Sequence, residues 1–512
     1  MNKVSLLILL ILPLIGYSQD VTILPTGILP SSHILKLKYS ELKNVSNANT
    51  GDIIFDLTFS QLRFYNGSEW NFVYNNEQPI SSSSSIKSST DSYGIGICID
   101  SDSSIYSLGS FTDSVFFKND TLVSTAAQNT FIFKTTIDNE LIWRDKISST
   151  ESLNTKGIQV DSLDNIYIYG SFSGTISYQT FSATTFGGED IFIFKINKLG
   201  QLLLAKRLGG SDNNSISSLK ISPDNTVYFC GKFKGNMPFA SINRVSSGGF
   251  DGYLAEMDSL GNQLSFIKIG GAYDENIEDF AFTDGTHLVV GGNFGSSLSI
   301  GTSNITPNPS SFGNMYLATL DFQNFTWESA LRLNSNGNYN EIHSLSTGVN
   351  GAIYVSGVFS GTFSYDLGSI TSFPSSVFNG FILQTSLSLN TNWAYKFSGY
   401  TLESCEKVIS DNRGNAYFIL NGLSQVIYST FFNYSSKGNG DTQIVKLSPT
   451  GNLLGRKIFS SAHEETLKDI YIGKDGKTYY LGTFKNKLIV DNIKLESIEG
   501  KKSTFWGFYD NE

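Results

Sequence analysis

Short segments in which apolar and polar residues alternate recur along most of the chain. Residues 104–111 read "SIYSLGSF", residues 165–172 read "NIYIYGSF" and residues 352–359 read "AIYVSGVF". Alternation with a period of two residues predicts β-strands. Short polar stretches with Asp, Asn or Gly, such as "SPDN" and "GKDG", separate the strands and predict tight turns. The pattern therefore predicts an all-β protein.

Two sequence columns repeat with one period. The first is a glycine in the recurring strand, and the second is the polar residue that begins a later strand. Successive members are 61 to 65 residues apart in both columns, which indicates seven copies of one unit. The first column is Gly109, Gly170, Gly231, Gly292, Gly357, Leu420 (in place of glycine) and Gly482, and the second is Asn129, Asp190, Asp251, Asn314, Asn379, Asp441 and Ser503.

Each unit contains four predicted strands, which we name a to d. In the second unit these are "KGIQVD", "NIYIYGSF", "DIFIFKI" and "QLLLAKRL". Seven four-stranded units predict a seven-bladed β-propeller. A β-solenoid would use shorter coils, and a string of immunoglobulin-like sandwiches would need longer units with more strands.

The last unit lacks a strand d, because the chain ends soon after "STFWGFYD". A serine-rich segment precedes the first unit, and its "SSTDS" at 88–92 matches "SSTES" at 148–152, which follows a strand d. We therefore expect a strand at about 80–87 that completes the seventh blade and closes the ring, leaving no open edges. The alternative is that the serines form a flexible linker.

"DNRGNAYFIL" at 411–420 and "DGYLAEM" at 251–257 carry a family resemblance. The units resemble the repeats of bacterial seven-bladed β-propeller proteins, many of them exported and uncharacterised, and the resemblance covers about residues 80–512. It implies the fold and says little about function, because one fold supports many functions.

The first 77 residues do not share the period. Residues 1–18 have Lys3, an apolar stretch and small residues, as in a cleaved signal peptide. Residues 19–77, with strands around "YNGSEW", resemble a short β module of bacterial envelope and tail-fibre-like proteins. We expect three parts: a signal peptide, this small module, and a propeller at 78–512.

Composition narrows the choice of partners. The formal net charge is -10 and no basic run offsets it, so nucleic acid is not expected as a partner. The apolar N-terminal stretch is too short for a good membrane span, and no later segment is apolar enough for one. Cys98, Cys230 and Cys405 are too dispersed for a disulfide framework, so we interpret them as small buried residues.

Most of the residues that could carry chemistry have a structural explanation. The tyrosine of strand b and the phenylalanine two residues after the glycine recur in nearly every unit, which predicts packing between blades. The glycine predicts a close backbone approach or a bulge. The Asp-rich turns "DSDSS" and "DSLDN" lack the glycine and closing glutamate of a calcium-binding loop and are interpreted as hydrogen-bonded turns.

An enzyme is not expected, and no metal or other cofactor is predicted. His33, His287, His343 and His463 show no metal-ligand spacing. No nucleophile elbow is found, and Asp100 and Asp161 enter turns. The arginines that a sialidase would need fall on outer strands d, namely Arg144, Arg207, Arg332 and Arg456.

A binding face is predicted from the strand order. The d–a turns and the b–c connections, which run to about fifteen residues or more, lie on one face, and loops on a rigid scaffold commonly bind ligands. The candidate binding residues lie in the d–a turns and combine amide, acidic and aromatic side chains; the alternative is that they are solvated turns. They are Asn213, Tyr273, Asp274, Glu275, Tyr339, Tyr400, His463 and Glu464.

Three functional hypotheses follow. The first is a non-catalytic periplasmic scaffold or accessory subunit, monomeric apart from its partner, that docks one face onto an envelope or outer-membrane protein complex. No C-terminal sorting domain follows the last unit, which favours the periplasm over the cell surface. The second is a secreted carbohydrate-binding or adhesion protein. The third is a glycoside hydrolase, which a cluster of acids around the channel mouth would distinguish.

Overall fold

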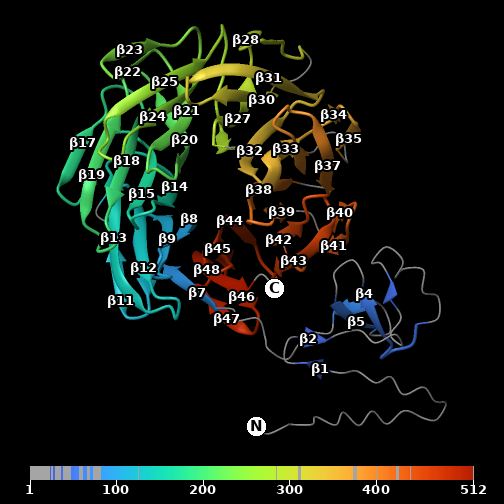
Figure 1. Ribbon diagram of the computed structural model, residues 1–512. Helices are drawn as coiled ribbons and strands as arrows, with labels where there is room; N and C mark the ends of the chain where they lie inside the picture. Colours follow the sequence, from blue (N-terminus) through green and yellow to red (C-terminus); the bar gives the residue numbers. More distant parts are fainter. Residues whose placement is uncertain are drawn as a thin grey trace, which may run out of the picture. The chain divides into compact units, whose positions relative to one another are not determined.

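Seven antiparallel blades surround a central axis in the computed structural model (Figure 1). The structure describes residues 82–510 except 125, 284, 310–312, 373–377, 400–401, 423–425 and 439, and before them only residues 23–24, 27–28, 36–37, 48–56, 61–65 and 70–72. The chain divides into two compact units, residues 1–78 and 79–512. The predicted signal peptide lies outside the described residues.

The first unit is a small β element. Its four-stranded sheet has the order β3 (Lys36–Leu37), β4 (Ile53–Asp56), β5 (Gln61–Tyr65) and β6 (Trp70–Phe72). A two-stranded ladder of β1 (Ile23–Leu24) and β2 (Gly27–Ile28) precedes it. Strands β5 and β6 pair from Arg63↔Phe72 to Tyr65↔Trp70, the first and last pairs of the ladder.

The second unit is the predicted seven-bladed propeller, with strands a to d running from the axis outward. Blade 1 is β8 (Tyr93–Ile99), β9 (Ile105–Phe111), β12 (Gln128–Thr135) and β13 (Leu141–Ser149). Blade 2 is β14 (Leu153–Val160), β15 (Ile166–Phe172), β18 (Asp190–Ile196) and β19 (Leu202–Leu208). Blade 3 is β20 (Asn214–Ile221), β21 (Val227–Phe233), β24 (Asp251–Met257) and β25 (Gln263–Ile269).

The remaining blades repeat this order. Blade 4 is β26 (Asp279–Phe282), β27 (His287–Phe294), β30 (Asn314–Asp321) and β31 (Thr326–Ser335). Blade 5 is β32 (Asn340–Thr347), β33 (Ile353–Phe359), β36 (Asn379–Thr385) and β37 (Thr391–Ser398), with the short 3-10 helix η1 (Val349–Gly351) in its a–b turn. Blade 6 is β38 (Glu403–Ser410), β39 (Ala416–Gly422), β42 (Asp441–Leu447) and β43 (Leu453–Phe459).

Blade 7 is built from both ends of the propeller, which confirms the predicted closure. It consists of β44 (Glu465–Ile472), β45 (Lys477–Lys485), β48 (Lys502–Asp510) and, as strand d, β7 (Ser82–Ser88). The serine-rich segment pairs with the last strand from Thr504↔Ile86 to Phe508↔Ser82. The side chain of Ile86 is fully buried beside Trp506, so the segment is part of the core.

The b–c connections, expected as long loops, form two-stranded hairpins on the face that also carries the d–a turns. Four of these hairpins continue the sheet of the preceding blade, because their first strand pairs with its strand d: β10–β11 (Ser114–Phe117, Asp120–Val123), β16–β17 (Thr175–Tyr178, Phe181–Thr184), β34–β35 (Thr362–Tyr365, Gly368–Thr371) and β40–β41 (Val426–Ser429, Asn433–Ser435). Three form separate sheets: β22–β23 (Asn236–Phe239, Ile242–Val245), β28–β29 (Leu298–Ile300, Ser303–Ile305) and β46–β47 (Lys487–Val490, Ile493–Glu496).

The glycine column is explained by a close approach between strands a and b. A Cβ atom at Gly231 would lie 2.1 Å from the carbonyl oxygen of Ser215, and one at Gly357 would lie 2.1 Å from that of Glu341. Strand a bulges immediately after this contact, for example between Ile342 and Ser344. The glycine therefore permits a β-bulge that leaves one residue of strand a out of register.

Leu420, which replaces the column glycine in blade 6, faces a residue on strand c that also departs from the pattern of the other blades. In the other six blades the glycine pairs with an aromatic residue of strand c, as Gly482 does with Phe505, whereas Leu420 pairs with Gln443. The aromatic ring covers the glycine, since a Cβ atom at Gly482 would lie 2.9 Å from the Phe505 ring. In blade 6 a larger residue on strand b thus accompanies a smaller one on strand c.

This exchange predicts strong coupling between the two positions. Leu420→Gly should open a cavity and cost about 3–5 kcal/mol of unfolding free energy, while Gln443→Phe should crowd Leu420 and cost about 1–3 kcal/mol. The double substitution recreates the pair of the other blades and should be more stable than Leu420→Gly alone. Urea unfolding of the four proteins measures this, and additive costs would contradict the interpretation.

The repeated aromatic residues are structural, as predicted. The strand-b tyrosines are at most 5% exposed, and several of their hydroxyl groups donate to the a–b turns: Tyr106 to Asp100 Oδ2 at 3.0 Å and Tyr479 to Asp475 Oδ2 at 2.8 Å. Asp100 Oδ1 also accepts the backbone N–H of Ser104 at 2.8 Å, which closes the "DSDSS" turn. The three cysteines are buried, and burial raises the pKa of each thiol.

Candidate functional site

Six of the inner strands carry a bulge next to the residue that pairs with the column position, and one residue at each bulge is left out of register. In blade 4 the ladder begins after this place, and Glu278 is the corresponding residue. Each blade thus contributes one residue at this place. These residues are Ile95, Lys156, Ser217, Glu278, His343, Glu406 and Lys468. The blades therefore share this backbone position, whereas the side chain that occupies it differs from blade to blade.

Four of these side chains line one cleft, which we call the channel-mouth cleft. It has a volume of about 480 Å³ and lies on the face of the d–a turns, where blades 4 to 7 meet. Its lining residues are Glu278, Tyr339, His343, Val358, Phe378, Leu402, Glu403, Ser404, Glu406, Asn421, Thr466 and Lys468. The cleft thus combines carboxylates, one histidine, one lysine and apolar rings.

His343 lies among the carboxyl groups of the cleft. Its Nδ1 atom lies 3.2 Å from the carbonyl oxygen of Cys405, and its Nε2 atom lies 3.7 Å from a carboxylate oxygen of Glu341. Burial lowers the pKa of His343, but the interaction with the Glu341 carboxylate and the charge of Glu406 outweigh burial and raise it overall. The interaction with His343 in turn lowers the pKa of Glu341.

Glu406 and Glu278 are two carboxyl groups in different environments. Glu406 accepts hydrogen bonds from Ser404 Oγ at 2.8 Å and Lys468 Nζ at 3.3 Å. Burial raises the pKa of Glu406, but the charges of Lys468 and His343 outweigh it and lower the pKa overall. Burial raises the pKa of Glu278, and no ion pair to Glu278 occurs among the described residues.

An aromatic pair forms the rim of the cleft. The rings of Tyr339 and Phe378 stack with centroids 4.4 Å apart, and Leu402 lies on the same rim. Tyr339 and Leu402 are each 40% exposed. Exposed aromatic and apolar groups beside buried charges are typical of recognition sites.

A second set of charged groups lies on the inner strands β20, β26 and β44. Lys220 of blade 3 pairs with Asp279 of blade 4 at 3.0 Å and donates to the carbonyl oxygen of Leu345 of blade 5 at 3.0 Å. Asp279 also accepts the backbone N–H of Leu345 at 2.7 Å. On blade 7, Asp469 accepts the N–H of Ile97 from blade 1 at 3.0 Å. These groups join neighbouring blades, so we assign them to the scaffold.

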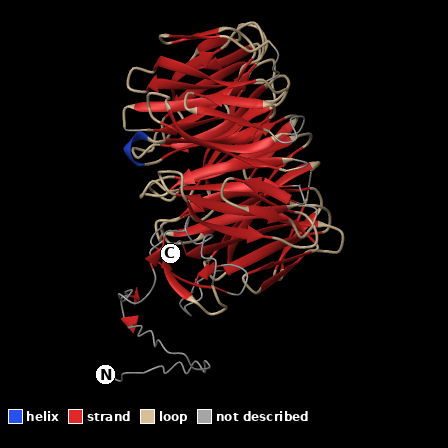
Figure 2. Ribbon diagram, turned by 90° about the vertical axis from the view of Figure 1, so that its right-hand side faces the viewer, coloured by secondary structure: helices blue, strands red, loops and turns tan. Residues whose placement is uncertain are grey.

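The opposite face carries the short a–b and c–d turns. In its c–d turns, a side chain accepts backbone N–H groups of the same turn. For example, Asp258 Oδ1 accepts the N–H groups of Leu260 and Asn262 at 2.9 and 2.8 Å. Its a–b turns also bond between blades, as where Ser101 N–H donates to Asp164 at 2.9 Å. Figure 2 shows the ring from its edge. One face carries the b–c hairpins and the d–a turns, whereas the other carries only the short a–b and c–d turns among the described residues.

The predicted binding residues lie around the ring rather than in one site. Tyr339 alone of them lines the channel-mouth cleft, Tyr273 is 68% exposed, and Tyr400 lies outside the described residues. The side chains of Asn213 and Asp274 accept hydrogen bonds from the N–H groups of Glu189 and Phe250 respectively, which braces neighbouring turns.

The other predicted residues are partly occupied by structural contacts. Glu275 is only 1% exposed and accepts the N–H of Gly271 at 2.7 Å, so it stabilises its turn. Glu464 pairs with Lys502 at 3.0 Å. His463 Nε2 lies 3.2 Å from Asn486 Nδ2, in a second hollow between blades 6 and 7.

The sequence analysis missed Glu278, Glu406 and Lys468 and considered His343 only as a possible metal ligand. Glu278 lies directly before β26, and the other three lie in strand a of their blades. A signal was present, because a polar residue interrupts the alternation in "IEDF", "IHSL", "CEKV" and "LKDI". Such an interruption at the same place in successive units indicates a bulge with an outward-turned side chain.

Glu465, next to the predicted Glu464, predicts a pH dependence of stability. Burial raises its pKa from 4.5 to about 7, and Asp441 adds to this, although hydrogen bonds from Ser461 oppose it. The folded state therefore holds this proton more tightly than the unfolded state. Protonated Glu465 therefore contributes to the unfolding free energy below about pH 4.5, and this contribution is lost as pH rises to about 7.

Glu465→Gln should remove this dependence. Between pH 5 and pH 8, the unfolding free energy of the unaltered chain should fall relative to that of the variant by about 3 kcal/mol. The Gln oxygen can still accept the N–H of Ser461. Urea unfolding at four pH values measures the difference, and parallel pH profiles would show that Glu465 is ionised throughout.

Comparison with known proteins adds little about function. No protein-family model matches the chain. It is 29% identical over 138 residues to the regulatory protein FlaEY of Caulobacter vibrioides, and 29% identical over 152 residues to an uncharacterised WD repeat-containing protein, L264, of Acanthamoeba polyphaga mimivirus. Each match covers 26% of this chain, and they cover only 14% and 11% of those relatives.

Several solved structures are also similar. The Dos1 propeller matches with a TM-score of 0.39 and 9% identity over 83% of this chain and 95% of that one. A catalytically inactive virginiamycin B lyase from Staphylococcus aureus matches with a TM-score of 0.38 and 7% identity over 83% and 99%. A Synechocystis apocarotenoid oxygenase matches with a TM-score of 0.41 and 9% identity over 84% and 96%.

Proposed function

We propose that this protein is a non-catalytic scaffold or accessory subunit that binds a protein complex of the cell envelope through the face with the d–a turns and b–c hairpins. The observation that carries the proposal is the contrast between the two faces. One face has short, self-bonded turns, whereas the other has the channel-mouth cleft and exposed aromatic groups.

The architecture suits such a role. A propeller closed by its N-terminal strand is a rigid platform, and a rigid platform loses little entropy when it binds. Tyr339 and Leu402 supply exposed apolar area at the rim, while Glu278 supplies a carboxyl group with no ion-pair partner among the described residues. A partner that inserts a basic or amide side chain toward Glu278 would fit this arrangement.

The location that we propose is the periplasm. The supporting observation is the N-terminal segment, which resembles an export signal. Within the described part of the chain, no helix has the length and apolarity that a membrane crossing requires. A partner in an outer-membrane assembly would keep the protein at the envelope.

Crosslinking in intact cells tests this proposal. The tagged chain would be crosslinked and isolated, and its partners identified by mass spectrometry in the periplasmic, membrane and medium fractions. The proposal predicts one dominant envelope complex, linked through the d–a turns or b–c hairpins. Recovery of the protein alone from the medium would contradict it and favour a secreted glycan-binding or adhesion protein.

A second candidate, a glycoside hydrolase, is favoured by the carboxyl groups of the cleft. Glu278, with a raised pKa, and Glu406, with a lowered pKa, have the contrast that an acid and a base require. The full chain and a Glu278→Gln, Glu406→Gln variant would be incubated with envelope glycan fragments. Product release by the unaltered chain alone would support a hydrolase, and no release by either would leave the scaffold as the better account.

A further inference from the structure

The channel-mouth cleft holds more carboxyl groups than cations. Glu278 and Glu406 line it, and Glu341 lies 3.7 Å from His343 Nε2. The cations are Lys468, which pairs with Glu406 at 3.3 Å, and His343 when it is protonated. When all three carboxyl groups are ionised, at least one negative charge therefore has no counter-ion in the cleft.

Glu278 is the carboxyl group that a ligand can use, because it is partly exposed. It accepts a hydrogen bond from Asn276 Nδ2 at 3.2 Å, and among the described residues it has no ion pair. Burial raises the pKa of Glu278, and the charge of Lys156, which does not line the cleft, opposes this only in part. Glu403 also lines the cleft, but its side chain is fully buried. A cation that entered the cleft would therefore supply the counter-ion that Glu278 lacks.

The rim of the cleft carries an aromatic surface. The rings of Tyr339 and Phe378 stack with centroids 4.4 Å apart and an interplanar angle of 29°. The Tyr339 hydroxyl interacts with Glu341, which holds the ring beside the carboxyl groups. An aromatic face attracts cations, and a flat guanidinium can stack on the ring while its N–H groups reach a carboxylate. The combination of ring and carboxylates therefore favours arginine over lysine.

The cleft also has apolar walls. Val358 and Leu402 line it, and Leu402 is 40% exposed. The volume of about 480 Å³ is within the range of small-molecule sites and exceeds the need of a single side chain. An apolar residue next to the arginine would cover Leu402 and exclude water, which strengthens the interactions of the charges.

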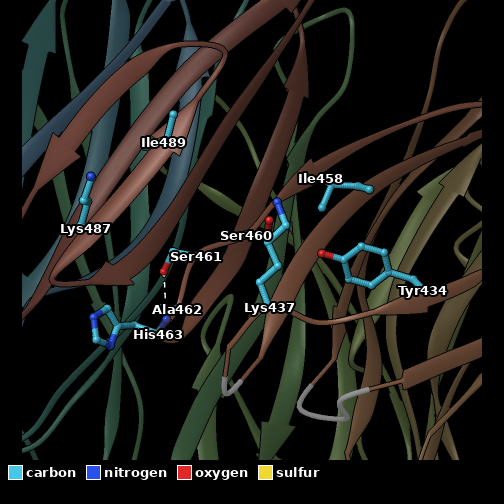
Figure 3. Close-up of a pocket in the computed structure, with 9 residues that line it drawn as sticks. All are labelled: Tyr434, Lys437, Ile458, Ser460, Ser461, Ala462, His463, Lys487 and Ile489. Carbon is cyan, nitrogen blue, oxygen red and sulfur yellow. Dashed lines mark hydrogen bonds between the residues drawn. The ribbon is translucent and has the colours of Figure 1, made fainter. Parts of the chain in front are cut away.

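The second hollow, between blades 6 and 7, lacks this combination. Its volume of about 670 Å³ is larger than that of the cleft. Figure 3 shows that Lys487 and Ile489 lie on one side of it and Tyr434 and Ile458 on the other. No Asp or Glu is among the residues that line it. Of these two hollows, only the channel-mouth cleft offers carboxylates to a cation.

We propose that the channel-mouth cleft binds an arginine side chain of the partner protein, with an apolar residue next to it in the partner's sequence. This role rests on the proposed function, because it names the group with which the partner enters that face. The guanidinium would stack on Tyr339 and donate hydrogen bonds to Glu278. It would also compete with Lys468 for Glu406, and the apolar neighbour would pack on Leu402.

Selection from a random heptapeptide library against the full chain supplies the probe. The expected peptides carry arginine next to an apolar residue. Citrulline in place of this arginine keeps the shape of the side chain but has no charge, so it should weaken binding at least about tenfold. Lysine in the same place should weaken binding by about threefold to tenfold, because an ammonium keeps the charge but cannot stack.

Two variants of the cleft should change the affinity for the arginine peptide in opposite directions. Glu278→Gln should weaken binding about tenfold, because the amide has no charge to pair with the guanidinium. Lys468→Gln should strengthen binding by about twofold to fivefold, because Lys468 no longer competes for Glu406. Glu464→Gln is the matched control, because Glu464 lies on the same face but pairs with Lys502 and does not line the cleft. It should change binding less than about twofold.

A purely structural role for Glu278 and Lys468 would not give changes of opposite sign. The arginine site is rejected if arginine is not enriched among the selected peptides, if the citrulline peptide binds as tightly as the arginine peptide, or if both variants shift the affinity in the same direction. The proposed function fails separately, if the rim of the cleft does not crosslink to an envelope protein in cells. Rim crosslinks without any dependence on arginine would therefore reject only the arginine site.

Discussion

A chain that begins at residue 90 is expected to unfold at a much lower temperature than one that begins at residue 79. The shorter chain lacks β7, which pairs with β48 and buries Ile86 against Trp506. Burial of one isoleucine contributes about 3 kcal/mol, and each lost ladder hydrogen bond about 1 kcal/mol. We therefore expect a loss of at least about 5 kcal/mol of unfolding free energy.

The longer chain is the control, because it lacks the first compact unit but keeps the whole ring. Calorimetry of both chains measures the effect. The shorter chain should also aggregate, since it exposes the edge of β48, and a synthetic peptide of residues 79–90 should restore part of its stability. Equal melting temperatures for the two chains would show that the ring does not depend on β7.

Gly231→Ala is expected to cost about 3 kcal/mol of unfolding free energy, although it adds a single methyl group. The new Cβ atom would lie 2.1 Å from the carbonyl oxygen of Ser215 and 2.9 Å from the Cα atom of Ile216. Both are backbone atoms, so relief requires strand a to move and the bulge at Ser217 to be lost.

The matched control is Gly455→Ala in β43, where nothing lies within 4 Å of a Cβ atom. This substitution should be neutral or should stabilise the fold by up to about 1 kcal/mol, because alanine restricts the unfolded chain. Urea unfolding of both variants measures the difference. If both substitutions lower the unfolding free energy by the same amount, the close contact of strands a and b does not explain why glycine recurs in the column.

The fold could be predicted because its determinants are local and repeated. The column from Gly109 to Gly482 and the alternation of each strand fix the number of blades, and the match of "SSTDS" with "SSTES" locates the closing strand. The hairpins were missed because each b–c strand has only three or four residues, as in β46, and its pairing depends on the neighbouring blade.

The channel-mouth cleft could not be predicted in the same way. Glu278, His343, Glu406 and Lys468 are 62 to 65 residues apart in sequence, and only the ring brings them together. Prediction from turn composition found Tyr339, which lies on the rim of the cleft, but it also selected Glu275, which is buried. Composition identifies turns, whereas burial and the direction of a bulged side chain depend on the tertiary structure.

We propose that the protein binds its partner through the face that carries the channel-mouth cleft, and photo-crosslinking tests this claim. A photo-crosslinking amino acid would be placed in living cells at Tyr339 or Leu402 on the rim, each 40% exposed, and at Leu163 or Leu260 on the opposite face, 71% and 76% exposed. We predict that the two rim positions link to the same envelope protein and that the opposite positions link to none. Crosslinks from Leu163 and Leu260 alone would contradict the claim.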